Sequence, residues 1–123
     1  MRKIQITAGD VSAIGLLKDN ATADAVWDAL PISAQANTWG DEIYFGISVH
    51  VEEAADAGDV VELGALAYWP PGNAFCIFFG RTPASQGDEI RAASAVNGLG
   101  SIEGDSTVFK QVVGGSMVTI EKA

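Results

Sequence analysis

One stretch of the sequence indicates the fold class most clearly: Ala65-Leu-Ala-Tyr-Trp-Pro-Pro-Gly-Asn-Ala-Phe-Cys-Ile-Phe-Phe79. Two apolar runs, 65–69 and 74–79, flank Pro70-Pro71-Gly72-Asn73, and Pro, Gly and Asn are the residues that build tight turns. The pattern predicts two strands joined by a short turn. The second run is apolar at every position, so we expect both of its faces to be covered.

A second strand signal precedes this pair. Five apolar residues share one phase of an extended chain: Ile43, Phe45, Ile47, Val49 and Val51. Five polar or amphipathic residues occupy the opposite phase: Glu42, Tyr44, Ser48, His50 and Glu52. This alternation predicts a half-exposed strand over 42–52 with a kink at Gly46.

The rest of the chain reads as short extended pieces and two helical segments. A helix is predicted from Thr22 to Leu30, because its apolar residues recur at helical spacing, Asn20 is a candidate N-cap and Pro31 ends the pattern. Further strands are predicted at 3–7, 12–18, 95–103 and 116–121, one or two helical turns at 106–112, and loops at 32–38, 53–59 and 82–88. The order predicts a mostly β protein with closed or covered sheets.

Length and charge limit the classes of function. The chain has 123 residues, which predicts one domain over 1–123. Sixteen acidic residues against seven scattered basic ones give a net charge of -9, so a nucleic-acid partner is not expected. No apolar run is long enough to cross a membrane, and the N-terminus lacks a signal-peptide pattern, so we expect a cytoplasmic protein without a membrane partner. The oligomeric state is left open.

The usual catalytic motifs are absent. The sequence has no phosphate-binding loop, dinucleotide fingerprint or zinc-protease motif, and it holds one histidine and one cysteine. We therefore predict no metal and no cofactor. His50 is interpreted as a solvated strand residue, because same-face neighbours on a strand lie too far apart to assume a catalytic pair. Cys76 is interpreted as a small buried hydrophobe without a base beside it.

The aromatic residues around the proline turn are the better candidates for a binding surface. Rigid rings beside a fixed turn make an apolar groove that loses little side-chain entropy on binding. Tyr68 and Trp69 are consecutive, so they point to opposite faces of their strand. Trp69, next to Pro70, is the residue that we expect in a groove.

Two motifs resemble a known family. Trp39-Gly-Asp-Glu-Ile-Tyr-Phe45 and the segment from Gly64 to Gly80 are similar to small bacterial and archaeal proteins of unknown function with a cyclophilin-like fold. The similarity extends over nearly the whole chain, since 20–30 looks like the first cyclophilin helix and 96–104 like a later cyclophilin strand. The resemblance implies a closed, mostly antiparallel β-barrel of about eight strands with a helix at each open end.

The same resemblance carries departures that bear on function. Cyclophilins have an arginine that hydrogen-bonds the prolyl amide, and the matching stretch here, Gly40-Asp41-Glu42-Ile43, is acidic. Ala74 and Cys76 replace a glutamine and a phenylalanine of the family pattern. A prolyl isomerase without its arginine lacks the main electrostatic stabilisation of the transition state.

Three functions follow as hypotheses. The first is a small-ligand or peptide binding module without catalysis, whose groove residues are Glu42, Tyr44, Tyr68, Trp69, Asn73, Phe75, Cys76 and Arg81. The second is a divergent prolyl isomerase of low activity, with Arg81 as the one nearby substitute cation. The third is a non-catalytic subunit that binds another protein through the exposed face of the 42–52 strand. Glu42 is expected to be partly exposed, either binding a cation or donor-bearing ligand or capping backbone amides.

Overall fold

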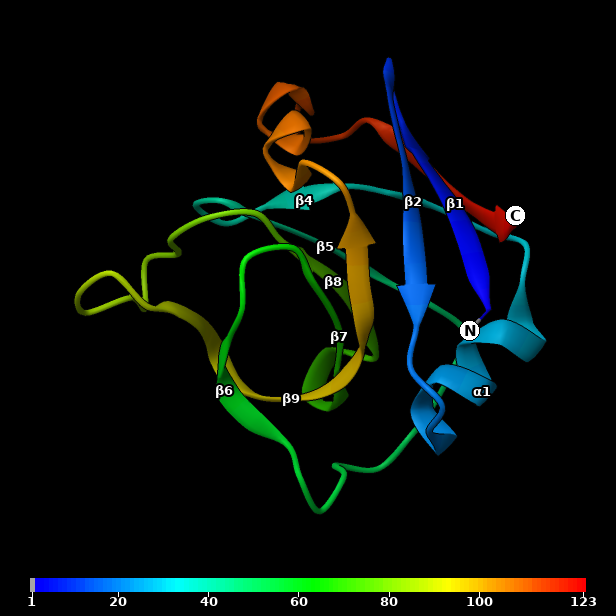
Figure 1. Ribbon diagram of the computed structural model, residues 1–123, viewed down its shortest axis with the longest axis horizontal. Coiled ribbons are helices and arrows are strands. Elements are labelled where there is room, and N and C mark those ends of the chain that lie inside the picture. The colour runs from blue at the N-terminus through cyan, green and yellow to red at the C-terminus, as the bar shows by residue number, and fades with distance from the viewer. Residues whose placement is uncertain (1) are drawn as a thin grey trace.

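The computed structural model describes residues 2–123 and shows a single curled antiparallel sheet (Figure 1). Its ten strands are β1 (Lys3–Ala8), β2 (Val11–Leu17), β3 (Ile32–Gln35), β4 (Asn37–Thr38), β5 (Glu42–Gly46), β6 (Gly58–Val61), β7 (Ala65–Trp69), β8 (Ala74–Phe78), β9 (Ile90–Glu103) and β10 (Met117–Lys122). Neighbouring strands follow the order β3-β10-β1-β2-β9-β7-β8-β5-β4, and β6 pairs with β9. The predicted mostly β class is confirmed, but the barrel-like sheet has ten strands rather than about eight and is not closed as predicted.

The sheet is not a closed ring of hydrogen-bonded strands, because its path ends at β3 and β4. These two strands are consecutive in the chain and only Ala36 separates them. β3 pairs with β10 and β4 pairs with β5, so the segment 32–38 passes from one end of the sheet to the other. The two edge strands of the sheet, β3 and β4, are therefore held close together by the covalent chain and not by hydrogen bonds to each other.

The prediction of a loop over 32–38 was wrong. In β3 the half-buried Ile32 and Ala34 alternate with two exposed residues, Ser33 and Gln35. This alternation is typical of a strand, although most of the side chains are small or polar. Ala36 also donates its amide to Ser116 O at 2.8 Å and accepts from the amide of Gly115 at 2.8 Å. Partners distant in sequence thus decide this segment, which local composition does not reveal.

Two hydrophobic clusters lie on the two faces of β8. Every residue of β8 is buried. Phe75 and Ile77 face the larger inner core together with Ile43 and Phe45, and the Phe45 and Phe75 rings stack with centroids 5.4 Å apart. Ala74, Cys76 and Phe78 face a smaller outer cluster that includes Ala67 of β7. The predicted burial of both faces is confirmed.

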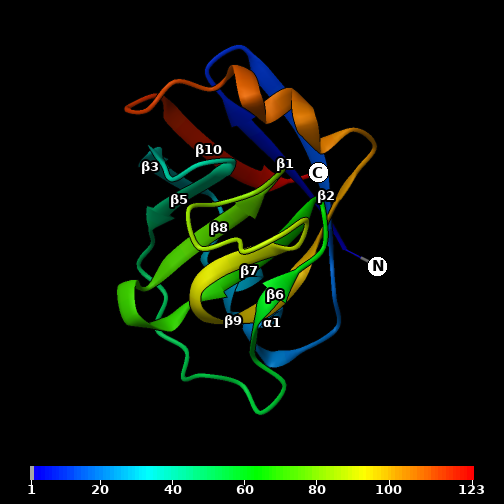
Figure 2. The same ribbon diagram turned by 90° about the vertical axis from the view of Figure 1, so that its left-hand side faces the viewer.

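Strand β9 covers the outer face because it bends. Its second half pairs with β2 and β7, and a register shift opposite Leu66 and Ala67 breaks the β7 ladder. At Gly100 a Cβ atom would collide with the carbonyl oxygen of Leu16, so only glycine allows this close approach. The first half, residues 90–96, pairs with β6 and packs on the outer cluster (Figure 2). We call residues 90–96 the arch.

The helical segments lie at opposite ends of the barrel (Figures 1 and 2). Helix α1 (Ala21–Ala29) begins where Asn20 Oδ1 accepts from the amide of Ala23 at 2.8 Å, as predicted, and the short helical segment η2 (Ser106–Gln111) buries Phe109. A third helical turn, η1 (Pro70–Gly72), joins β7 to β8. Within residues 2–123, no helix is long and apolar enough to span a membrane.

The strand predicted over 42–52 is shorter than expected. β5 ends at Gly46, which pairs with Ala74, the first residue of β8. Beyond this pair the partner chain turns into η1, so no strand remains for the next residues to pair with. The predicted loop over 53–59 also needs a small correction, because β6 begins at Gly58.

The stacked rings at the centre of the inner core give the first prediction. Phe45 is 1% exposed, so Phe45→Ala is expected to lower the free energy of unfolding by about 3–5 kcal/mol through lost burial and the cavity left behind. Urea unfolding measures the loss. Val113→Ala is the matched control, because Val113 is 72% exposed. A loss near zero at Phe45 would contradict the packing described.

Candidate functional site

A cavity of about 270 Å³ lies between the outer face of β5, β8 and β7 and the arch. Aromatic, small apolar and acidic side chains line it: Trp39, Glu42, Tyr44, Trp69, Cys76, Ala92, Ala93 and Val96. Glu42 carries the one formal charge among them, and most of the wall is apolar. The two sequence motifs at 39–45 and 64–80 together supply five of these residues.

The turn between β4 and β5 positions three of the lining residues, Trp39, Glu42 and Tyr44, at the cavity. The amide of Trp39 donates to Glu42 O at 2.9 Å and the amide of Glu42 donates to Trp39 O at 3.2 Å, so Trp39 and Glu42 form a pair across a two-residue turn. Gly40 has φ +60, and a Cβ there would lie 2.9 Å from Arg81 O, so glycine is required on two counts. Tyr44 follows Glu42 on the same face of β5.

The turn is fixed to the end of β8. Asp41 accepts from the amide of Phe79 at 2.9 Å, and its own amide donates to Arg81 O at 2.8 Å. These backbone bonds hold the turn against the strand that carries Cys76. These bonds therefore fix the backbone positions from which the Trp39 and Glu42 side chains project.

The Trp69 indole is held from two sides. A Cβ atom at Gly72 would lie 2.7 Å from the indole ring, so η1 packs directly against Trp69 and leaves room for glycine alone. The indole Nε1–H donates to Ser94 Oγ of the arch at 2.7 Å. Trp69 thus links strand β7 to the arch on the other side of the cavity.

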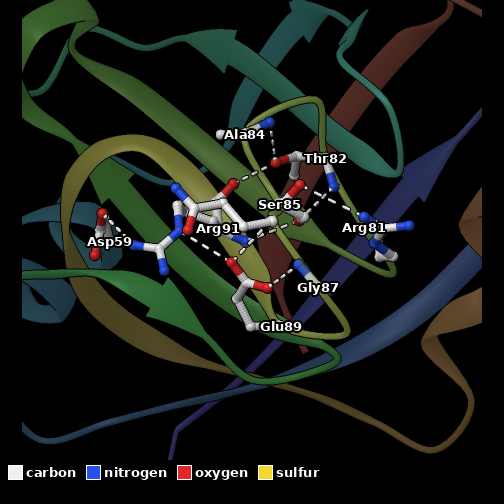
Figure 3. Close-up of polar contacts among 9 residues, drawn as sticks. Asp59, Arg81, Thr82, Ala84, Ser85, Gly87, Glu89 and Arg91 are labelled. Carbon is white, nitrogen blue, oxygen red and sulfur yellow. Dashed lines mark hydrogen bonds and ion pairs between the residues drawn. The ribbon is translucent and has the colours of Figure 1, made fainter.

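Polar contacts fix the arch to its surroundings (Figure 3). Arg91 donates from Nη1 to Asp59 Oδ2 at 2.8 Å and from Nε to Glu89 Oε2 at 3.1 Å. Glu89 also accepts from the amides of Gln86 and Gly87, and these backbone bonds lower its pKa to about 2. Thr82 Oγ1 donates to the carbonyl of Arg91. Arg91 is therefore committed to carboxylates outside the cavity.

The Glu42 carboxyl is buried without a cation. Glu42 is 6% exposed, and its carboxyl forms no ion pair with any residue in the described range 2–123. Burial raises its pKa to about 7, and a hydrogen bond from the Cys76 thiol lowers the pKa in part. Burial and the adjacent Glu42 charge raise the pKa of Cys76 well above its usual value. Cys76 is buried as predicted, and although Glu42 lies beside it, that carboxyl disfavours a thiolate rather than generating one.

The eight predicted groove residues divide into two groups. Glu42, Tyr44, Trp69 and Cys76 line the cavity together. The other four do not line it: Tyr68, Asn73, Phe75 and Arg81. Glu42 is more deeply buried than the partial exposure we expected, because the arch covers its face of β5.

The four outlying residues have other places in the structure. Tyr68 and Phe75 are 0% exposed on the inner face and belong to the core, so assigning them to a groove was wrong. Arg81 is exposed on the loop after β8 and donates to Ser85 O at 3.5 Å. Asn73 Oδ1 lies 2.8 Å from the Tyr68 hydroxyl and 3.0 Å from His50 Nδ1, outside the cavity.

His50 lies in a loop rather than in a strand. It is exposed, its Nδ1 contacts Asn73, and its Nε2 lies 3.0 Å from Glu52 Oε1; these hydrogen bonds, Asn73 first, raise its pKa. The Tyr68 hydroxyl accepts from the amide of Val51 at 3.2 Å, so the network anchors the loop after β5. In the part of the chain that the structure describes, no three histidine, cysteine or acidic side chains gather as metal ligands.

Sequence reasoning missed four cavity residues: Trp39, Ala92, Ala93 and Val96. The position of Trp39 follows from its turn with Glu42, and the Gly40-Asp41 pair was the available signal. Alanines have no side-chain chemistry to mark a site, and those of the arch reach the cavity only because β9 bends.

Comparisons with known proteins extend over the whole fold. A family model described as Cyclophilin-like matches residues 2–121. The chain is similar to a hypothetical protein from Archaeoglobus fulgidus with a solution structure, at 43% sequence identity and a TM-score of 0.83. The match covers 99% of this chain and 95% of that one. No curated protein matches the chain.

The raised pKa of Glu42 gives the second prediction. Its carboxyl titrates at about 7 in the folded protein against 4.5 ordinarily, so the folded state is favoured by protonation and loses stability as pH rises through this range. Glu42→Gln is expected to match the wild type near pH 4 and to be more stable by about 3 kcal/mol near pH 8.

Chemical unfolding at a series of pH values measures this difference. Glu53→Gln is the matched control, because Glu53 is an exposed carboxylate in the loop before β6. The difference between wild type and Glu42→Gln is the relevant quantity, since other carboxylates add their own pH dependence to both proteins. A difference independent of pH would contradict the burial of an ionisable Glu42.

Proposed function

The chain belongs to the cyclophilin-like family, and we propose that it binds a small organic ligand in the cavity between β5, β7, β8 and the arch. The observation that carries the proposal is an apolar cavity, braced by the Trp69–Ser94 hydrogen bond, whose wall includes one buried carboxyl with no basic partner among residues 2–123. Pockets of this kind, mostly apolar with a few placed polar groups, are typical of small-molecule sites.

The dimensions favour a small ligand over an extended peptide. At about 270 Å³ the cavity is slightly smaller than the usual range of ligand pockets. The arch covers the cavity, and the Trp69–Ser94 hydrogen bond joins the arch to strand β7. A polypeptide chain would need an open groove along the strands, whereas this cavity accommodates a compact organic group.

The surroundings of the cavity do not support isomerase chemistry. Twisting a prolyl amide is assisted by a cation that donates to the prolyl nitrogen, and the wall offers a carboxyl at the corresponding motif. Arg81, the candidate substitute, is exposed outside the cavity, and Arg91 is paired with Asp59 and Glu89. We therefore propose binding without prolyl isomerisation.

The alternative function, binding of another protein, required an exposed strand face that the structure does not have. That hypothesis used an exposed strand face from Glu42 to Glu52. The strand ends at Gly46, Glu42 is buried, and Tyr44 faces the cavity beneath the arch. No specific observation now favours this function over a small-ligand site.

Tryptophan fluorescence tests the proposal. Trp39 and Trp69 line the cavity, whereas Trp27 packs under Arg2 and Lys122, so Trp27→Phe leaves two reporters at the site. Titration with small neutral and charged organic molecules is expected to give a saturable change for at least one compound.

A blocking variant distinguishes the cavity from other surfaces. Ala93 lines the cavity and is exposed, so Ala93→Phe is expected to fill the opening and abolish the response. Ala55→Phe, at an exposed loop position, is the matched control and is expected to leave it intact. Absence of a saturable response to every compound, or an unchanged response in Ala93→Phe, would contradict the proposed function.

A further inference from the structure

We infer that the cavity recognises a small alkylated ammonium group, tertiary or quaternary, held between the rings of Trp39, Tyr44 and Trp69 and the carboxylate of Glu42. The inference rests on the proposed function, since both concern the same cavity. It names the chemical class of the ligand, which the apolar character of the wall alone leaves open.

The aromatic walls are the first argument. Three of the eight lining residues are aromatic and two of these are tryptophans, the side chain that attracts cations most strongly through its ring face. Gly72 and Ser94 hold the Trp69 ring in place, and the turn at Gly40 holds the backbone from which Trp39 projects. Rings fixed in advance lose little entropy when they enclose a cation.

The charge at the site is the second argument. Glu42 is buried and has no basic partner within residues 2–123, although burying a carboxylate is costly unless it is paired. A bound cation would supply the missing partner. None of the described residues that line the cavity is basic, and the net charge of -9 also disfavours an anionic ligand.

The small number of acceptors selects an alkylated ammonium. A primary ammonium carries three N–H donors, each of which needs an acceptor when it leaves water. The carboxyl of Glu42 is the one charged acceptor on a wall otherwise formed by rings, alanines, a valine and a thiol. Methyl groups on the nitrogen remove the unsatisfied donors and pack against the alanine and aromatic surfaces.

The inference includes a pH dependence. Glu42 titrates near neutrality, so it attracts a cation fully only above that range. The titratable groups that face it are Tyr44 on its own strand and Cys76 on β8, while the arch contributes Ala92, Ala93 and Val96. Affinity for a permanent cation is therefore expected to rise with pH through about 7, as Glu42 ionises.

A matched pair of probes tests the inference. Choline carries a trimethylammonium group, and 3,3-dimethylbutan-1-ol has the same shape with carbon in place of the charged nitrogen. Binding of each is measured by Trp39 and Trp69 fluorescence in the Trp27→Phe protein, near pH 8 and at moderate salt that screens nonspecific attraction. We expect choline to bind about tenfold more tightly than the alcohol.

The control variants separate the possible outcomes. Glu42→Gln is expected to reduce the preference for choline to what the aromatic rings alone supply while retaining the affinity for the alcohol, and Glu53→Gln to change neither. Equal affinities for the two probes, or a preference that Glu42→Gln does not reduce, would overturn the inference and leave the proposed small-ligand site standing. Binding of neither probe would overturn the inference as well, and failure of every compound in the wider panel would remove the proposed function itself.

Discussion

The pair of backbone hydrogen bonds between Trp39 and Glu42 is the constraint on which both the fold and the site depend. This turn returns the chain from β4 to β5, and β4 is the continuation of β3, which pairs at the other end of the sheet. The turn that lets one segment join the two ends of the sheet therefore also places an indole and a carboxyl side by side at the cavity. Gly40, with φ +60, is the residue that allows both.

The cavity exists at a cost to stability. An ionised Glu42 beneath the arch is less stable than the same residue in water, as its raised pKa expresses. An apolar residue at this position would fit the surrounding rings and alanines without that penalty. Natural proteins break local rules of this kind mainly at functional sites, which is the physical reason to place function at Glu42 rather than at the well-satisfied network around His50.

Sequence reasoning recovered the elements whose patterns are local. The apolar run of β8, the N-cap of α1 and the shared face of Ile43 and Phe45 follow from periodicity and turn chemistry. Segment 32–38 was missed because its partners, β10 and β5, give it strand structure that its own polar composition hides. Alternation placed Glu42 correctly on the outer face, but its burial depends on the bend in β9, a tertiary feature that no pattern near Glu42 encodes. Tyr68 was misplaced because the groove set included both Tyr68 and Trp69, although consecutive strand residues point to opposite faces.

We hold that Glu42 is a buried carboxyl with no basic partner within residues 2–123 and that a bound cation pairs with it. NMR titration of its side-chain carboxyl carbon, assigned by comparison with the Glu42→Gln spectrum, tests this most directly. The account predicts a midpoint at about pH 7 in the free protein and a clear downward shift when choline saturates the site. A midpoint near the ordinary value of 4.5, unchanged by choline, would contradict it.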